Sequence, residues 1–219
     1  MTRDELARIL DHSVLKPEAD LHEIRLGIDV VRTWRIGFYC VQPCWVRIAA
    51  DALAGTDSHV ISVVGFPHGC DRPEVKARAA ALAAGEGARE IDTVMNFGAL
   101  RSGDDRTVAG DIEAVVRAVP GIPVKVILEA SALDEAQKRL ACRLAVEAGA
   151  AFVKTSTGFH PSGGATVADV RLMRAEVGGK VGVKASGGIR NLADARAMLD
   201  AGANRLGTSA SAAILAALE

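Results

Sequence analysis

Short runs of apolar, β-prone residues alternate with longer segments of helical periodicity along the whole chain. The runs are rich in Val, Ile and Leu, which is typical of strands buried on both faces of a parallel sheet. The segments between them combine Ala and Leu with Arg and Glu at the spacing of amphipathic helices. The expected strands are residues 11–15, 37–42, 59–65, 89–95, 123–129, 151–155, 180–185 and 204–207.

Eight strands that alternate with helices favour an α/β fold, a closed (β/α)8 TIM barrel. Thr2 followed by Glu5 predicts a short N-terminal capping helix, because a side-chain oxygen and an acid three residues later form a capping box. The alternative is an open doubly wound sheet, but no GxGxxG sequence follows the first strand. Because no Pro-rich or Ser-rich linker interrupts the pattern, we expect residues 1–219 to form a single domain.

Polar residues and glycines indicate where the helices begin and end. Side chains suited to cap a helix, each followed by an acid three residues later, are Asp20, Asp71, Thr166 and Asn191. Clusters of Ala and Gly that can end a helix and turn the chain back into the sheet lie around residues 84–88, 148–150 and 201–203.

The composition limits the classes of function. The chain is 49% hydrophobic with a net charge of −1, so it lacks the basic surplus that nucleic-acid or membrane-surface binding requires. No apolar run reaches the ~18 residues of a membrane span, and MTRDELARIL does not resemble a signal peptide. The four cysteines lack metal-finger spacing. Reduced thiols in a cytoplasmic protein are the expectation.

Two lysines occupy equivalent positions at the ends of expected buried strands. Lys154 lies in AAFVKTSTGF and Lys184 lies in KVGVKASGGIR. Burial and a neighbouring cation both disfavour protonation, and a neutral lysine amine is a nucleophile toward carbonyl carbon. The simpler interpretation is that both side chains extend to solvent or form salt bridges. Two lysines in matched contexts favour the catalytic hypothesis, but their spacing does not show which of the two lysines is the nucleophile.

Strand alternation predicts which side chains share the barrel interior. Lys154 should face the same way as Ser156, and Lys184 the same way as Gly182, which leaves room for a long side chain. Asp92 lies within the expected fourth strand and would complete a cluster of two cations and one anion. It could neutralise one lysine, shuttle protons, or do both. Polar residues at other strand ends are Asp11, His12, Cys40, Lys125 and Glu129.

Two glycine-containing loops predict a phosphate site. Ser186-Gly187-Gly188-Ile189-Arg190 follows the seventh expected strand, and Gly207-Thr208-Ser209 follows the eighth. Glycines allow a ligand close to the backbone, and N–H groups at helix starts attract anions. Barrels frequently bind phosphate at these two loops, although the glycines could simply form tight turns.

Histidines give no sign of a metal centre. His12 beside Asp11 is more typical of a structural hydrogen bond than of a base or ligand, and only His68 and His160 follow strands closely enough to approach a site. Metal-dependent aldol or isomerase chemistry would need two or three convergent His, Asp or Glu ligands. We therefore expect no metal and no cofactor.

Eight segments in order resemble the deoxyribose-phosphate aldolase family over nearly the whole length. They are DHSVLKP, CVQP, VVGFPHG, EIDTVMNFG, KVILE, FVKTSTGF, VKASGGIR and RLGTSA. The resemblance implies a metal-free class I (Schiff-base) aldolase on a (β/α)8 barrel. It would reversibly cleave 2-deoxy-D-ribose 5-phosphate to D-glyceraldehyde 3-phosphate and acetaldehyde, and a homodimer is the assembly common in this family.

The resemblance also implies residue roles. Lys154 matches the imine-forming lysine, Lys184 the lysine that keeps it unprotonated, and Asp92 the acid of a proton relay with water. We expect Cys40 at the substrate end of the second strand. Residues that match the sugar site are Asp11 and Thr157, and those that match the phosphate cradle are Gly187, Gly188, Gly207 and Ser209.

The chain departs from the family pattern in two places. Some members have a C-terminal Tyr that helps to move a proton, whereas this sequence ends at Glu219 and has Tyr39 as its only tyrosine. Proton transfer would then fall to Asp92, Lys184 and water. Where some members have a second serine in the last phosphate loop, Ala210 follows Ser209. Alternatives are another Schiff-base aldolase or transaldolase, a phosphosugar isomerase, and a phosphosugar-binding barrel without lyase activity.

Overall fold

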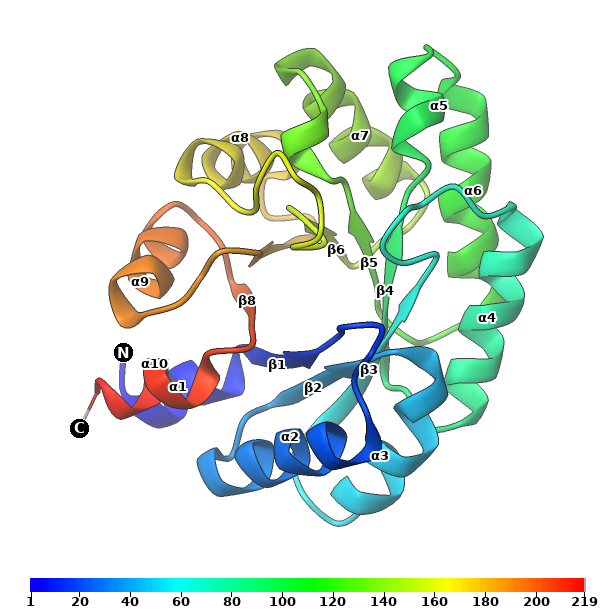
Figure 1. The fold of residues 1–219 in the computed structure, drawn as a ribbon. Helices are drawn as coiled ribbons and strands as arrows, with labels where there is room; N and C mark the ends of the chain where they lie inside the picture. The colour runs from blue at the N-terminus through cyan, green and yellow to red at the C-terminus, as the bar shows by residue number, and fades with distance from the viewer. Residues whose placement is uncertain (219) are drawn as a thin grey trace.

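Eight parallel strands close into a barrel in the computed structural model, which describes residues 1–218. The strands pair in sequence order, and β1 pairs with β8 to close the sheet. Figure 1 shows the helices as an outer ring around these strands. The strands are β1 (Leu10–Val14), β2 (Phe38–Val41), β3 (His59–Val64), β4 (Glu90–Val94), β5 (Val124–Ile127), β6 (Phe152–Lys154), β7 (Gly182–Ser186) and β8 (Arg205–Thr208). The predicted TIM barrel and its strand order are confirmed.

A short helix, α1, precedes the first strand, and the remaining helices lie after the strands. Thr2 and Glu5 form the predicted capping box of α1. The α-helices are α1 (Arg3–Arg8), α2 (Leu21–Trp34), α3 (Val46–Leu53), α4 (Pro73–Gly85), α5 (Phe97–Arg101), α6 (Asp105–Ala118), α7 (Glu135–Glu147), α8 (Val167–Val177), α9 (Leu192–Asp200) and α10 (Ser211–Ala216). Two 3-10 turns are η1 (Pro43–Trp45) and η2 (Ala130–Ala132).

Most of the predicted helix boundaries agree with the structure. Asp20, Thr166 and Asn191 each accept a hydrogen bond from the N–H group three residues later. The prediction for Asp71 was wrong: α4 begins at Pro73, its N-cap is Arg72, and no side chain caps it. Proline at the first helical position fixes a helical φ and has no N–H group to satisfy, so this helix begins without a polar cap.

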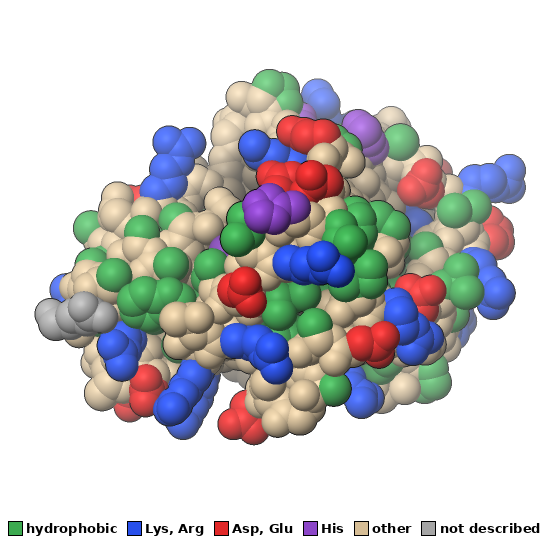
Figure 2. Space-filling model, turned by 60° about the horizontal axis from the view of Figure 1, so that its bottom comes forward, with side chains coloured by type: hydrophobic (Ala, Val, Ile, Leu, Met, Phe, Trp, Pro, Cys, Tyr) green, Lys and Arg blue, Asp and Glu red, His purple; other side chains and the backbone are tan. Residues whose placement is uncertain are grey.

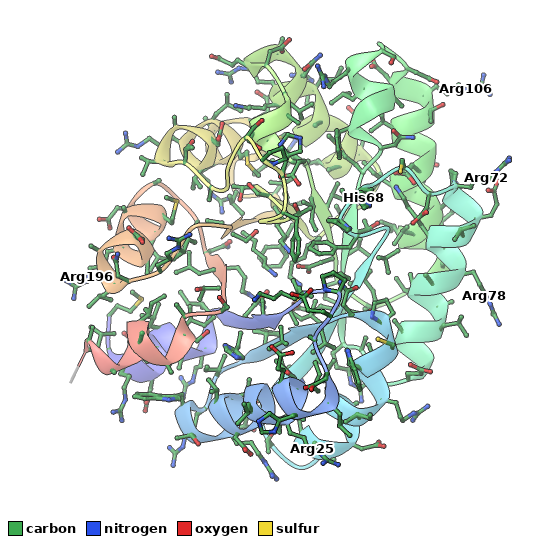
Figure 3. All side chains as sticks on the ribbon, viewed as in Figure 1. Arg25, His68, Arg72, Arg78, Arg106 and Arg196 are labelled. Carbon is green, nitrogen blue, oxygen red and sulfur yellow. The ribbon has the colours of Figure 1, made fainter. Side chains whose placement is uncertain are left out.

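The main hydrophobic core lies between the strands and the ring of helices. A second, smaller apolar cluster lies around Cys40, Ile61 and Val63, which share the inward-facing positions of β2 and β3. The rest of the barrel interior holds charged side chains, which distinguishes it from an ordinary packed barrel core. Figure 3 shows side chains filling the interior, while the labelled arginines extend outward from the helices.

The outer surface is mixed in charge on the face that Figure 2 shows, where Lys and Arg are interspersed with Asp and Glu. Within residues 1–218, no helix is both long and apolar enough to cross a membrane. The comparison of Glu219 with the C-terminal Tyr of some family members concerns a residue outside the described range.

Candidate active site

A cavity of about 680 Å³ opens at the carboxyl ends of the strands. It is lined by the carboxyl ends of β1, β7 and β8, by the loops after β1, β6, β7 and β8, and by part of α2; Lys154, the last residue of β6, forms part of its wall. The predicted site residues that line this cavity are Lys154, Thr157, Gly187, Gly188, Gly207 and Ser209. A barrel of this kind carries its chemistry at this end.

The other predicted site residues are buried and do not line the cavity. The side chains of Asp92 and Asp11 are fully buried, and Lys184 is 1% exposed. The Cys40 thiol is also fully buried, and burial raises its pKa to about 11. Asp92, Lys184 and Cys40 act on the charge of Lys154, and Asp11 contacts Lys184.

Both lysines contact one carboxylate oxygen. The Nζ atoms of Lys154 and Lys184 lie 2.8 Å and 2.7 Å from Oδ2 of Asp92. The two lysines are register partners on β6 and β7, which explains why their side chains run in parallel to the same acceptor. The predicted cluster of two lysines and Asp92 is therefore present, and it includes further charges.

Asp11 makes the electrostatic environments of the two lysines different, because it forms an ion pair with Lys184. Burial lowers the pKa of Lys184, but Asp11 and Asp92 outweigh burial and raise it above its ordinary value. Burial also lowers the pKa of Lys154; Asp92 opposes this effect, Lys184 adds to it, and the net pKa is lowered. The structure thus identifies Lys154 as the amine that loses its proton more easily.

Asp92 itself remains ionised. Burial raises the pKa of its carboxyl group, but Lys125, Lys154 and Lys184 together lower it well below the ordinary value. A carboxylate held in this way accepts hydrogen bonds from Lys154 and Lys184 and keeps their amines in place.

Gly207 explains how Lys184 reaches Asp11. Gly207 on β8 is the register partner of Asp11 on β1, so Lys184 on β7 must extend across β8 to meet it. A Cβ atom at position 207 would lie 3.0 Å from Cε of Lys184. The space at Gly182, which we expected to accommodate Lys184, is occupied instead by the ring of Phe152.

Three further charged residues lie in the barrel interior: Lys125, which the sequence indicated only as a polar strand residue, and Glu90 and Arg205, which were not predicted. Nζ of Lys125 lies 2.9 Å from Oδ1 of Asp92 and 2.5 Å from Oε2 of Glu90. Arg205 contacts both Glu90 and Asp11, and its guanidinium carbon lies 3.5 Å from the ring centroid of Phe38. Glu90 precedes Asp92 by two residues, so strand alternation was a usable signal that these carboxylates share a face.

The loops expected to bind phosphate border the outer part of the cavity. Gly187 and Gly188 have φ values of 86° and 83°, in the left-handed region that favours glycine. The N–H groups of Gly188 and Ser209 make no hydrogen bond within residues 1–218. The N–H of Ala210 donates to Oγ1 of Thr208 at 2.9 Å and is therefore not available to a ligand.

Thr157 is held at the cavity wall by a buried acid. Its hydroxyl donates to Oε2 of Glu129 at 2.5 Å and accepts a hydrogen bond from the N–H of Phe159. Glu129 adopts a left-handed conformation with φ of 52°, which ends β5 two residues before the expected end at position 129. The hydroxyl of Thr157 keeps one lone pair for a ligand.

The histidines and the tyrosine have structural contacts. Nδ1 of His12 lies 3.2 Å from Oγ of Ser211, and its ring stacks on Tyr39, as expected for a structural histidine. Burial lowers the pKa of His12 to about 4. The Tyr39 hydroxyl donates to the carbonyl oxygen of Ile24. His68 and His160 do not line the cavity, and residues 1–218 contain no group of three His, Cys, Asp or Glu positioned for a metal.

A parallel barrel with a buried lysine of lowered pKa in the wall of a cavity is the arrangement expected of an aldolase that forms an imine on lysine. The match to the DeoC/LacD family of aldolases spans residues 23–216, and the chain belongs to that family.

Relatives of known name and structure agree with this assignment. The deoxyribose-phosphate aldolase of Enterococcus faecalis is 50% identical over 96% of both chains. That of Methanothermobacter thermautotrophicus is 52% identical over 98% of this chain and 95% of its own. The deoxyribose phosphate aldolase of Aeropyrum pernix, described as a tetramer, superposes with a TM-score of 0.90 at 29% identity and covers 99% of this chain and 92% of its own.

Proposed function

We propose that the protein is a deoxyribose-phosphate aldolase. It reversibly cleaves 2-deoxy-D-ribose 5-phosphate to D-glyceraldehyde 3-phosphate and acetaldehyde through a Schiff base on Lys154. The observation that carries this proposal is the pair of lysines on one oxygen of Asp92, with the pKa of Lys154 lowered and that of Lys184 raised. The identity to named deoxyribose-phosphate aldolases supports the choice of substrate.

The reaction begins with the neutral amine of Lys154. It attacks the C1 aldehyde of the open-chain sugar, and loss of water leaves an iminium ion. The iminium accepts the electron pair of the C2–C3 bond as the C3 hydroxyl loses its proton, and glyceraldehyde 3-phosphate departs. The remaining enamine is protonated at C2, and hydrolysis of the resulting iminium releases acetaldehyde and the free amine.

Lys184 and Asp92 manage the protons in this proposal. Lys184 is charged and donates a hydrogen bond to Asp92, which also accepts one from Lys154. A proton can therefore pass between the two amines through the carboxylate, or to the substrate through a water molecule in the cavity above. Asp11 forms an ion pair with Lys184 and does not line the cavity, so we propose that it positions Lys184 rather than contacts the sugar.

The substrate phosphate is proposed to bind at the outer end of the cavity. The unoccupied N–H groups of Gly188 and Ser209 can donate to phosphate oxygens, and Arg190 also lines this part of the cavity. Binding at this distance from the reacting carbon orients the aldehyde toward Lys154. Thr157 is the proposed contact to a sugar hydroxyl. That Cys40, a buried neighbour of the lysines, belongs to the substrate site remains a prediction.

The test is turnover of 2-deoxyribose 5-phosphate, with both products identified, by the unaltered protein and a Lys154→Ala variant. The proposal expects acetaldehyde and glyceraldehyde 3-phosphate from the unaltered protein only. Transfer of a longer carbon fragment would identify a transaldolase, and tight binding without products would identify a non-catalytic barrel. Normal turnover by Lys154→Ala would exclude the imine mechanism.

We also infer that residues 1–219 act as one domain in the cytoplasm and that two copies associate as a homodimer. Ile48 on α3 and Leu82 on α4 are exposed apolar side chains on adjacent helices, linked by a hydrogen bond from Arg47 to Gly85. Such side chains are suited to an interface between copies. Light scattering after size-exclusion chromatography tests the assembly: a monomer at micromolar concentration would contradict it.

A further inference from the structure

The charged side chains inside the barrel form a closed ring of ion pairs. Lys125 connects Asp92 to Glu90, and Glu90 accepts hydrogen bonds from Nη1 and Nη2 of Arg205, each at 3.2 Å. Arg205 then reaches Oδ1 of Asp11 at 3.1 Å. The members of the ring in order, with each contacting the next and the last contacting the first, are Arg205, Asp11, Lys184, Asp92, Lys125 and Glu90.

The signs of charge alternate around this ring, so its three cations and three carboxylates balance. Among the ring residues, Lys154 forms an ion pair only with Asp92, which is also paired with Lys125 and Lys184. If Lys154 were protonated, the buried cluster would carry one uncompensated positive charge. Because a buried charge without a counter-ion is unfavourable, the neutral amine is the form that the cluster favours.

We propose that Glu90 and Arg205 are positioning residues of the aldolase reaction, which close the ring, balance its charges and leave Lys154 as the surplus amine. This inference rests on the proposed function, because it concerns the protonation of the nucleophile in that reaction. No contact joins Lys154 to Glu90 or Arg205. Any effect on Lys154 is therefore transmitted through the charges of the ring.

Few titratable groups lie close enough to Lys154 to act on its charge. Burial has the largest effect on the pKa of Lys154, and the groups that act on it by charge are Asp92 on β4, Lys184 on β7 and the Cys40 thiol on β2. The thiol is neutral near pH 7, since burial raises its pKa to about 11. Charge near Lys154 is therefore controlled by the ring.

Arg205 is well held in this position. Its guanidinium group lies 3.5 Å from the ring centroid of Phe38 and 5.3 Å from that of Phe152, and the residue is 8% exposed. Aromatic faces favour a cation and leave the edge of the guanidinium free for Glu90 and Asp11. The closing arm of the ring is therefore fixed in the structure without any contact to the cavity.

The charge count predicts opposite effects for the two residues. Glu90→Gln removes a negative charge, which should make protonation of Lys154 harder and move the acid limb of the reaction to lower pH. Arg205→Gln removes a positive charge, which should make protonation easier and move the limb to higher pH. The double variant restores the balance and should return the midpoint close to that of the unaltered protein.

The experiment measures trapping of acetaldehyde on Lys154 by sodium cyanoborohydride as a function of pH, quantified by peptide mass spectrometry. At a pH well below the midpoint, the rate should change about tenfold for each unit by which the midpoint moves. The near-ultraviolet circular dichroism of each variant confirms that the measured protein is folded. If Arg205→Gln does not fold, Lys125→Gln also removes a cation and should move the midpoint upward.

The outcomes separate the inference from the proposed function. Opposite displacements that cancel in the double variant support the ring. Midpoints that stay at the unaltered value, or that move in the same direction for both single variants, overturn it even if the unaltered protein is trapped normally. Failure of the unaltered protein to be trapped on Lys154 would instead overturn the proposed function.

Discussion

Replacing Lys184 by methionine should leave Lys154 protonated near neutral pH. The substitution removes the cation that shares Oδ2 of Asp92 with Lys154 at 2.7 Å and 2.8 Å. Lys184 is one of the groups that lower the pKa of Lys154, so its loss raises that pKa. The loss also gives Lys154 a larger share of Asp92, which acts in the same direction.

The size of the effect follows from this geometry. The two lysine ammonium groups share one carboxylate oxygen, so their charges lie about 4 Å apart. At an effective dielectric constant of 20, two unit charges at this distance interact by about 4 kcal/mol. An energy of this size changes the fraction of neutral amine by roughly a thousandfold. Allowing for relaxation around the smaller side chain, we expect kcat/KM at about pH 7 to fall by at least a hundredfold.

The assay is the pH dependence of kcat/KM for cleavage of 2-deoxyribose 5-phosphate, whose acid limb reports the essential base of the free enzyme. In Lys184→Met the limb should move to higher pH, and part of the activity should return in alkaline buffer. The matched control is Lys76→Met, because Lys76 is equally buried but pairs with Asp111 outside the ring. Activity lost equally at every pH in Lys184→Met, with an unmoved midpoint, would refute the electrostatic role of Lys184.

Other predictions concern the neighbourhood of the site. Gly207→Ala places a Cβ atom 3.0 Å from Cε of Lys184 and should lower kcat/KM by roughly 10- to 100-fold, whereas Gly110→Ala, at an open helical position, should not; equal activities would contradict this. Burial lowers the pKa of His12 from 6.5 to about 4, so as the pH falls the unfolded chain binds a proton on His12 before the folded protein does. The free energy of unfolding should therefore fall by up to about 3 kcal/mol between about pH 6.5 and pH 4. Denaturant unfolding of His12→Gln should show a shallower pH dependence, and an identical one would refute the assignment. EDTA should leave activity intact, and a loss that zinc restores would contradict the metal-free mechanism.

Much of the barrel could be predicted because its strands have a simple pattern. Most are short apolar runs followed by a polar or glycine-rich turn, and the register that pairs Lys154 with Lys184 follows from their matched positions. Strand ends were less accurate. Glu129 was expected to end β5, but its left-handed backbone takes it out of the sheet to bind Thr157, which is a contact distant in sequence.

The choice between the two lysines depended on contacts that one sequence does not reveal. Lys184 is held in its charged form by Asp11, and this contact requires closure of the barrel between β8 and β1 together with the absence of a side chain at Gly207. The remaining arm of the ring, through Glu90 and Arg205, likewise joins residues from strands that are far apart in the chain. Periodicity shows which side chains point inward, but not which of them meet.

The most direct test of the account is reduction of the protein with borohydride in the presence of acetaldehyde, followed by peptide mapping. A neutral amine at Lys154 and a charged one at Lys184 predict a stable two-carbon addition on Lys154 alone. Addition mainly on Lys184, or no addition to either lysine in folded protein, would contradict the central claim that the buried charges of the barrel select Lys154 as the nucleophile.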